Sequence, residues 1–166
     1  MNNYEIGAAF VAMCNGTEEK KTINGRNNLS VRIIGELLAL YSYSTPIAVY
    51  DGLKVVINQT FLSSATSKHQ NTISQKAFAC PVAVVLHFGG WGYGEADLLK
   101  QATPLYSYQK QVIEAANGRK YTRFVLRKQA SPTDNAVYNL HRYTTEQAAK
   151  DEAARLNRLA YGWSVQ

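Results

Sequence analysis

Hydrophobic positions near the N-terminus recur with the spacing of an α-helix. Ile6, Phe10 and Met13 fall near one helical face, and the asparagines that precede them can cap a helix. Asn15-Gly16 is a helix stop signal. The pattern therefore predicts a short N-terminal helix that ends at Asn15-Gly16.

Between residues 29 and 59 the pattern changes to short runs rich in β-branched and aromatic residues. Turn signals separate the runs LSVRIIGELLALYSY, TPIAVY and LKVVINQ. Asp51-Gly52 stands between two of these runs and is a strong hairpin signal. We therefore predict an antiparallel meander in this part of the chain.

The following segments predict a helix and then a strand. Residues 63–78 (SSATSKHQNTISQKAF) indicate a loop that leads into a helix, with Ser64 or Thr66 as its cap. The compact apolar run PVAVVLHF, at 81–88, predicts a buried strand. It leads into GGWGYG, a glycine-dense turn.

Two more strands and a helix are expected toward the C-terminus. KYTRFVLRK alternates as a strand does, and AVYNLHRY predicts another strand after the loop ASPTDN. Asn117-Gly118 fits a hairpin turn or the C-cap of a helix, and periodicity does not decide between them. Thr144 and Gln147 form a capping box in front of a run of good helix formers.

These elements predict an α+β fold, in which a mainly antiparallel β-sheet carries N-terminal, middle and C-terminal helices packed on it. The 166 residues are expected to form a single domain with a sizeable core. Hydrophobic residues make up 46% and charged residues only 18%, which argues against a largely disordered chain. The polar, turn-rich stretch at 16–28 is the candidate for a mobile loop.

The charge and the cysteines bear on partners and compartment. A formal charge of +6 at pH 7 favours an acidic partner such as nucleic acid. Cys14 and Cys80 belong to no CxxC pair, so we expect reduced thiols in a cytosolic protein. No membrane association is expected, because the longest apolar run near the N-terminus is too short to span a bilayer.

The sequence carries no catalytic or metal-binding signature. His69, His87 and His141 are isolated, without HxxxH spacing, so we expect neither a metal nor another cofactor. Cys80 and His87 would point to opposite faces of a strand, and no GxSxG motif occurs. We therefore expect a protein that is not an enzyme.

A basic segment from Arg119 to Lys128 is the first candidate for a binding surface. Tyr121, Arg123 and Arg127 share one face of the predicted strand, which suits phosphate contact and base stacking. The full candidate set for nucleic acid or another partner is Arg119, Lys120, Tyr121, Arg123, Arg127 and Lys128. The alternative is the solvated face of an amphipathic strand, or an edge strand kept soluble by its charge.

Two further candidates are a helix start and a turn. Backbone N–H groups at a helix start can hold an anion, with side chains from Ser64, Thr66, Ser67, Lys68 and His69. The alternative there is that the hydroxyls simply cap the helix. Trp91 and Tyr93 in the glycine-rich turn are candidates for aromatic contact, and their alternative is a tight turn with exposed aromatics.

The order of features from residue 27 to residue 71 resembles an uncharacterised small domain of unknown function found in bacteriophage and prophage proteins. The features that carry the resemblance are Asn28-Leu29-Ser30-Val31, Leu40-Tyr41 through Pro46-Ile47-Ala48, and Ser64-Ala65-Thr66-Ser67-Lys68-His69-Gln70. The domain commonly has two consecutive threonines where this chain has Ala65-Thr66. The resemblance implies a phage origin more than an activity.

The first expectation for function is a non-enzymatic phage or mobile-element accessory protein in the host cytoplasm. It would bind a host protein or protein–nucleic-acid complex, and inhibition of a host defence complex is the most concrete form. The alternative is a nucleic-acid-binding protein that uses the basic, aromatic strand at 119–128. A distant third is an enzyme acting on nucleic acid or a nucleotide. The sequence leaves the oligomeric state open.

Overall fold

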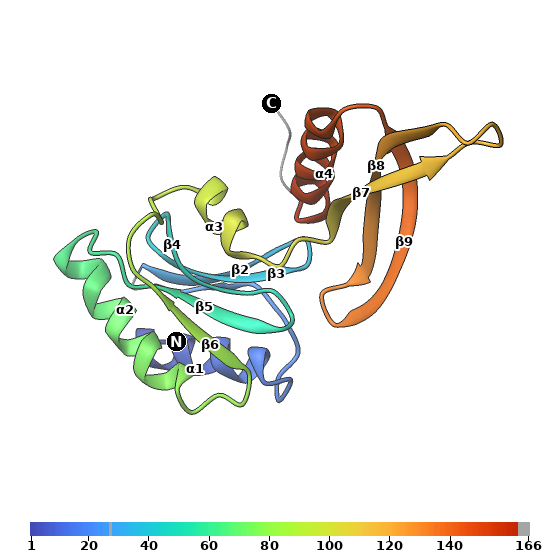
Figure 1. The fold of residues 1–166 in the computed structure, drawn as a ribbon. Helices are drawn as coiled ribbons and strands as arrows, with labels where there is room; N and C mark the ends of the chain where they lie inside the picture. Colours follow the sequence, from blue (N-terminus) through green and yellow to red (C-terminus); the bar gives the residue numbers. More distant parts are fainter. Residues whose placement is uncertain (27, 163–166) are drawn as a thin grey trace. The chain divides into compact units, whose positions relative to one another are not determined.

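The computed structural model describes residues 1–26 and 28–162. Their helices and strands confirm the predicted α+β fold, with helices near the N-terminus, in the middle and near the C-terminus (Figure 1). The backbone contacts divide the chain into two compact units, Met1–Ala102 and Thr103–Gln166. The expected single domain stays a prediction.

The N-terminal unit contains a sheet with the strand order β1-β2-β3-β4-β5-β6. Its strands are β1 (Ile23–Asn24), β2 (Leu29–Ile34), β3 (Leu37–Ser42), β4 (Thr45–Tyr50), β5 (Lys54–Asn58) and β6 (Ala83–His87). The pairs from β1 to β5 are antiparallel, which confirms the predicted meander. Asp51 shapes the turn between β4 and β5, because its Oδ1 accepts the N–H groups of Leu53 and Lys54.

Helices cover both faces of this sheet (Figure 1). The helices α1 (Asn3–Cys14) and α2 (Ser64–Ala77) pack on one face, where Phe10 and Ile73 join the same buried cluster as Leu40 of β3. The short helix α3 (Glu95–Gln101) lies over the opposite face, and its Glu95 accepts a hydrogen bond from Tyr41. The prediction of a capped N-terminal helix is confirmed, since Asn2 and Glu5 form a capping box.

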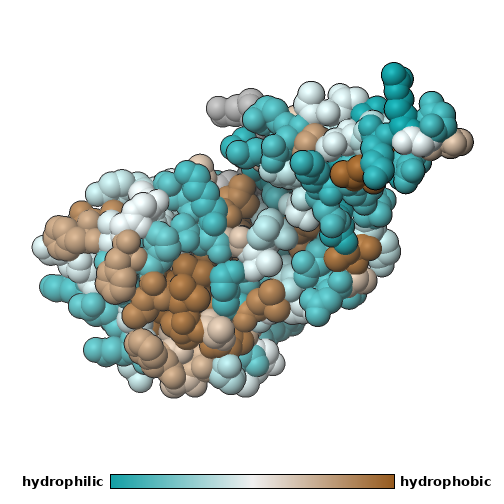
Figure 2. Space-filling model, viewed as in Figure 1, coloured by the Kyte–Doolittle hydropathy of each residue, from teal (hydrophilic) through white to brown (hydrophobic). Residues whose placement is uncertain are grey.

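The strand predicted at 81–88 exists as β6, but the prediction that it is buried was wrong. β6 is the last strand of the sheet and pairs in parallel with β5 alone. Val85 and Leu86 are 41% and 36% exposed, and no other described strand pairs with the outer side of β6. Figure 2 shows hydrophobic residues gathered over this part of the surface.

The C-terminal unit is a three-stranded antiparallel sheet with one helix. It consists of β7 (Tyr106–Glu114), β8 (Lys120–Ser131), β9 (Asp134–Tyr143) and α4 (Glu146–Ala160). Asn117-Gly118 lies in the hairpin turn between β7 and β8, so the turn reading is the correct one. The N-cap of α4 is Thr145 rather than the predicted Thr144, because the Thr145 side chain accepts the N–H of Ala148.

The polar stretch at 16–28 contains the short strand β1, which pairs with β2 through Ile23 and Val31. Residue 27 lies outside the described residues. The mobility of this stretch stays a prediction.

Candidate functional site

β8 has two different faces because side chains alternate along a strand. Leu126 points to the side that carries α4, together with its β7 partner Tyr108, whose hydroxyl donates to Glu146 of α4. Tyr121, Arg123 and Arg127 therefore share the other face, as the sequence predicted. We call this side of the three-stranded sheet the arginine face.

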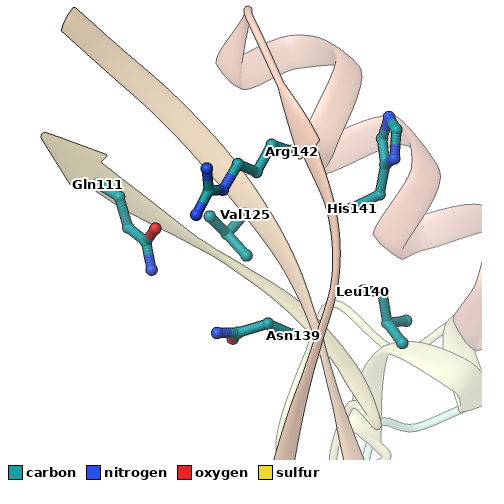
Figure 3. A pocket seen from close by; sticks show the side chains of 6 residues that line it. All are labelled: Gln111, Val125, Asn139, Leu140, His141 and Arg142. Carbon is teal, nitrogen blue, oxygen red and sulfur yellow. The ribbon is translucent and has the colours of Figure 1, made fainter. Parts of the chain in front are cut away.

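Strand pairing adds residues to the arginine face that the basic segment did not reveal. Val125 pairs with Arg142 of β9 and Gln109 of β7, while Arg127 pairs with Asn139 across a register shift. A hollow of about 380 Å³ lies here, and Figure 3 shows Arg142 pointing to one side of the strands and His141 to the other. The hollow is lined by Gln111, Val125, Asn139, Leu140, His141 and Arg142.

Arg142 could have been found from the sequence, because AVYNLHRY is a predicted strand that follows the basic strand after a short loop. Antiparallel pairing across that loop brings Arg142, the arginine of the second strand, beside the basic strand. The register shift between Leu126 and Arg127 decides that Arg142 stands opposite Val125. No local signal in the sequence reveals that shift.

The arginine face is positively charged without internal neutralisation. None of Arg123, Arg127 and Arg142 forms an ion pair with another residue in the described part of the chain. The β7 and β8 side chains on this face include no Asp or Glu; they are Ser107, Gln109, Gln111, Ile113, Tyr121, Arg123, Val125, Arg127, Gln129 and Ser131. Asp134 of β9 stands opposite Ser131, at the far end of the face.

Arg123 and Arg127 differ in their surroundings. The Arg123 guanidinium lies 4.6 Å from the centre of the Tyr121 ring, which holds the cation beside a ring that is 39% exposed. The Nε of Arg127 is buried and lacks a hydrogen-bond partner among the described residues. Because this atom is buried, a bound acceptor reaches it only if the side chain moves.

The rest of the predicted basic set lies elsewhere on the C-terminal unit. Lys120 and Lys128 alternate with the arginines and so point to the helix side of β8. The ammonium group of Lys128 lies 5.7 Å from the centre of the Tyr106 ring. Arg119 is an exposed residue of the hairpin turn. Three of the six residues predicted from sequence therefore share one face.

The helix start predicted as an anion site is capped by a residue outside the predicted set. Ser63 is the N-cap of α2, and its Oγ accepts the N–H of Thr66. Thr66 and His69 face the sheet, whereas Ser64 and Lys68 are exposed. Ser67 lies between them and is partly buried. The five residues are thus divided between two sides of the helix.

A polar network joins the buried side of that helix to β3 and α1. Ser42 Oγ lies 2.7 Å from Nδ1 of His69 and donates to Thr66 Oγ1, and Asn3 Nδ2 lies 3.0 Å from Nε2 of His69. A neutral imidazole satisfies both neighbours when Nδ1–H donates to Ser42 and Nε2 accepts from Asn3. Burial lowers the pKa of His69, which favours this neutral form.

The Ser42–His69 pair resembles a nucleophile with its base but lacks access. Ser42 is 0% exposed, so a substrate does not reach its hydroxyl. The network instead fixes the first turn of α2 against the sheet. Among the residues that the structure describes, no group of three His, Cys, Asp or Glu side chains is placed to hold a metal ion.

The two aromatic residues of the glycine-rich turn have different surroundings. Trp91 is 1% exposed, and its ring makes an edge contact with His87, so it does not offer a contact surface. Tyr93 is 63% exposed, and the nearby Phe61 and Phe88 are 75% and 73% exposed. Their loops are joined by hydrogen bonds from Tyr93 to the Leu62 carbonyl and from the Gly89 N–H to Thr60.

Within the described residues, no helix is both long and apolar enough to cross a membrane.

Comparison with known proteins gives a partial match. No curated protein and no solved structure matches the chain. A domain described as a family of unknown function (DUF8033) covers residues 10–82. This range includes the whole segment at 27–71 that resembles an uncharacterised domain, and it excludes β6 and the arginine face. In that range the chain is similar to a family of unknown function.

Proposed function

We propose that the protein works by binding, and that the arginine face binds single-stranded nucleic acid. The observation that carries the proposal is the placement of Arg123, Arg127 and Arg142 on one face of the sheet, opposite the face that carries α4. Guanidinium groups that form no ion pair with the described residues, gathered on a single face, are suited to a chain of phosphates, because each offers a planar fork of donors.

The dimensions of the strands suit an extended ligand. Arg123 and Arg127 stand four residues apart on β8, which is about 13 Å along a strand. Arg142 stands between them on the neighbouring strand, opposite Val125. Guanidinium groups spaced in this way can contact successive phosphates of one strand.

The neutral residues of the face supply contacts to bases. Gln109, Gln111 and Asn139 carry amides that both donate and accept hydrogen bonds. Tyr121 offers a ring on which an unpaired base can stack. An open sheet with an aromatic platform favours single strands, since the bases of a duplex are already stacked on each other.

A matched pair of double variants tests the proposal. Each double variant removes two positive charges from the β7–β8 hairpin. Arg123→Ala/Arg127→Ala removes them from the arginine face, and Lys110→Ala/Lys128→Ala removes them from the opposite, helix-bearing face. Binding of a labelled single-stranded oligonucleotide is measured by fluorescence anisotropy at low and near-physiological salt. We expect the arginine variant to weaken binding by about a hundredfold and the lysine variant by only a few fold. Equal losses in both variants would show that net charge, rather than this face, causes binding.

A protein partner is the second candidate, and the exposed aromatic residues Phe61, Phe88 and Tyr93 favour it. Large exposed aromatic side chains on neighbouring loops are typical anchors in protein interfaces. In this case the chain would be an accessory protein of a phage or mobile element that binds a host protein, for example to inhibit a defence complex. The resemblance at 27–71 is the reason to consider this origin.

Salt dependence separates the two candidates. Capture of a host protein that survives moderate salt and is lost in Phe61→Ala/Tyr93→Ala would support the second candidate. Capture that disappears with salt, or that persists in the aromatic variant, would count against it.

A further inference from the structure

β6 has a free edge of a kind that folded proteins usually protect. It is the last strand of its sheet, and its outer side pairs with no other described strand. Proteins commonly guard such edges with charged side chains, proline or a bulge. The strand Ala83–His87 contains none of these, and residues 77–94 carry no charged side chain.

The hydrogen bonds to β5 show which backbone groups of β6 face outward. The His87 carbonyl accepts the N–H of Gln59, so His87 directs its backbone groups toward the β5 side. In a strand, N–H and C=O of one residue point to the same side and alternate from residue to residue. Val84 and Leu86 therefore direct both of their backbone groups to the free edge.

We propose that β6 pairs with β6 of a second copy of this chain. An antiparallel pair about a two-fold axis at Val85 places Val84 of one copy opposite Leu86 of the other. Every outward N–H and C=O of Val84 and Leu86 then finds a partner, as in the hydrogen-bonded pairs of an antiparallel ladder. The six-stranded sheet continues across the axis into the sheet of the second copy.

Side chains in this register are complementary to themselves. Val84 and Leu86 meet on the side that carries α1 and α2, and Val85 meets its own copy on the other side. Phe88, which is 73% exposed, comes to lie beside Val82 of the second copy. No charge is brought against a like charge within the strands, and exposed apolar surface is removed from water. This self-complementarity identifies a second copy, rather than an unrelated strand, as the occupant.

The first test is the mass of the full-length protein by light scattering over an about hundredfold range of concentration. We expect twice the monomer mass of 18.4 kDa at the upper end of the range. Leu86→Pro removes an outward N–H that makes no bond to β5, so it should leave the internal ladder intact and give the monomer mass. The control is Leu53→Lys, which changes an exposed leucine (44% exposed) away from β6 and should keep the dimer. A proline at Leu53 would not serve, because the Leu53 N–H donates to Asp51.

A cross-link tests the register and does not depend on Leu86→Pro being folded. In a Cys80→Ser background, Val85→Cys places two thiols opposite each other at about 5 Å between Cβ atoms. Mild oxidation should give a disulfide-linked dimer with Val85→Cys and little with Leu86→Cys, whose opposite residue is Val84. A monomer at every concentration, or equal cross-linking by both variants, would overturn the proposal. Neither light scattering nor cross-linking involves the arginine face. The outcomes of both measurements are therefore independent of nucleic-acid binding.

Discussion

Ser42 Oγ and His69 Nδ1 are 2.7 Å apart, and this contact joins the end of β3 to the second turn of α2. Ser42 has no exposed surface, so its loss leaves the imidazole N–H without a partner inside the protein. We expect Ser42→Ala to lower the free energy of unfolding by about 1–3 kcal/mol. Urea denaturation followed by circular dichroism measures the change. An unchanged midpoint would show that water replaces the hydroxyl.

The same histidine makes stability depend on pH. Burial lowers the pKa of His69 in the folded protein, so the unfolded chain binds a proton more readily. The stability from this group is therefore present above the unfolded pKa near 6.5 and is lost as pH falls below it.

His69→Gln removes this titration while it keeps a polar side chain. We expect the loss of stability between pH 7 and pH 5 to be smaller in the variant than in the wild type, as measured by urea denaturation at each pH. Parallel curves for the two proteins would assign the pH dependence to other groups.

Arg142 should contribute to nucleic-acid binding although it lies outside the basic segment. Its removal takes one guanidinium from the arginine face, so Arg142→Ala should reduce the slope of log affinity against log salt by about 0.7. Lys150→Ala removes the same charge from an exposed position on α4 and is the control. A salt titration with single-stranded DNA measures both slopes. Equal slopes for the two variants would argue against a phosphate contact at Arg142.

Gly25 lies in a confined part of the N-terminal unit. A Cβ at this position would lie 2.1 Å from the Leu29 carbonyl oxygen and 2.3 Å from Cδ1 of Ile6. We expect Gly25→Ala to lower the melting temperature, at a cost of about 1–3 kcal/mol, because the backbone must move.

Gly7 provides the comparison for that substitution. A Cβ there would meet only the flexible Lys76 side chain, at 3.3 Å from Cδ. Gly7 lies within α1, where alanine is favoured over glycine by about 0.5–1 kcal/mol. Gly7→Ala should therefore leave the melting temperature unchanged or raise it. A similar decrease in both variants would contradict the steric explanation.

Asn157 connects α4 to the start of β7. Its Oδ1 accepts the N–H groups of Leu105 and Tyr106, and its Nδ2 donates to the Tyr106 carbonyl. We expect Asn157→Ala to destabilise the C-terminal unit by about 2 kcal/mol or more, since several backbone groups lose their partner. Asn157→Asp keeps the acceptor and should cost less. Hydrogen exchange of the β7 amides measures the change, and equal protection in all three proteins would contradict it.

Local signals in the sequence were sufficient for most elements. The capping residues of α1, the Asp51-Gly52 turn and the alternation of β8 each depend on neighbours within a few residues. For this reason the antiparallel meander and the shared face of Tyr121, Arg123 and Arg127 could be predicted. Where two similar residues compete, as Thr144 and Thr145 do for the start of α4, local signals leave an error of one residue.

Other features depend on contacts between distant segments. An apolar run looks the same at the centre of a sheet and at its edge, so the exposure of β6 follows from strand order alone. The burial of Trp91 and the contact between Ser42 and His69 also join segments that are not neighbours in the chain.

The sequence by itself determined most of the helices and strands and the faces of β8, because hydrogen-bonding and packing preferences act over short distances along the chain. It did not reveal β1 or β7. Tertiary structure decided that Arg142 joins Arg123 and Arg127, and that β6 keeps one side free. Both outcomes depend on register and strand order, which arise from the packing of the whole sheet and are encoded in no single segment.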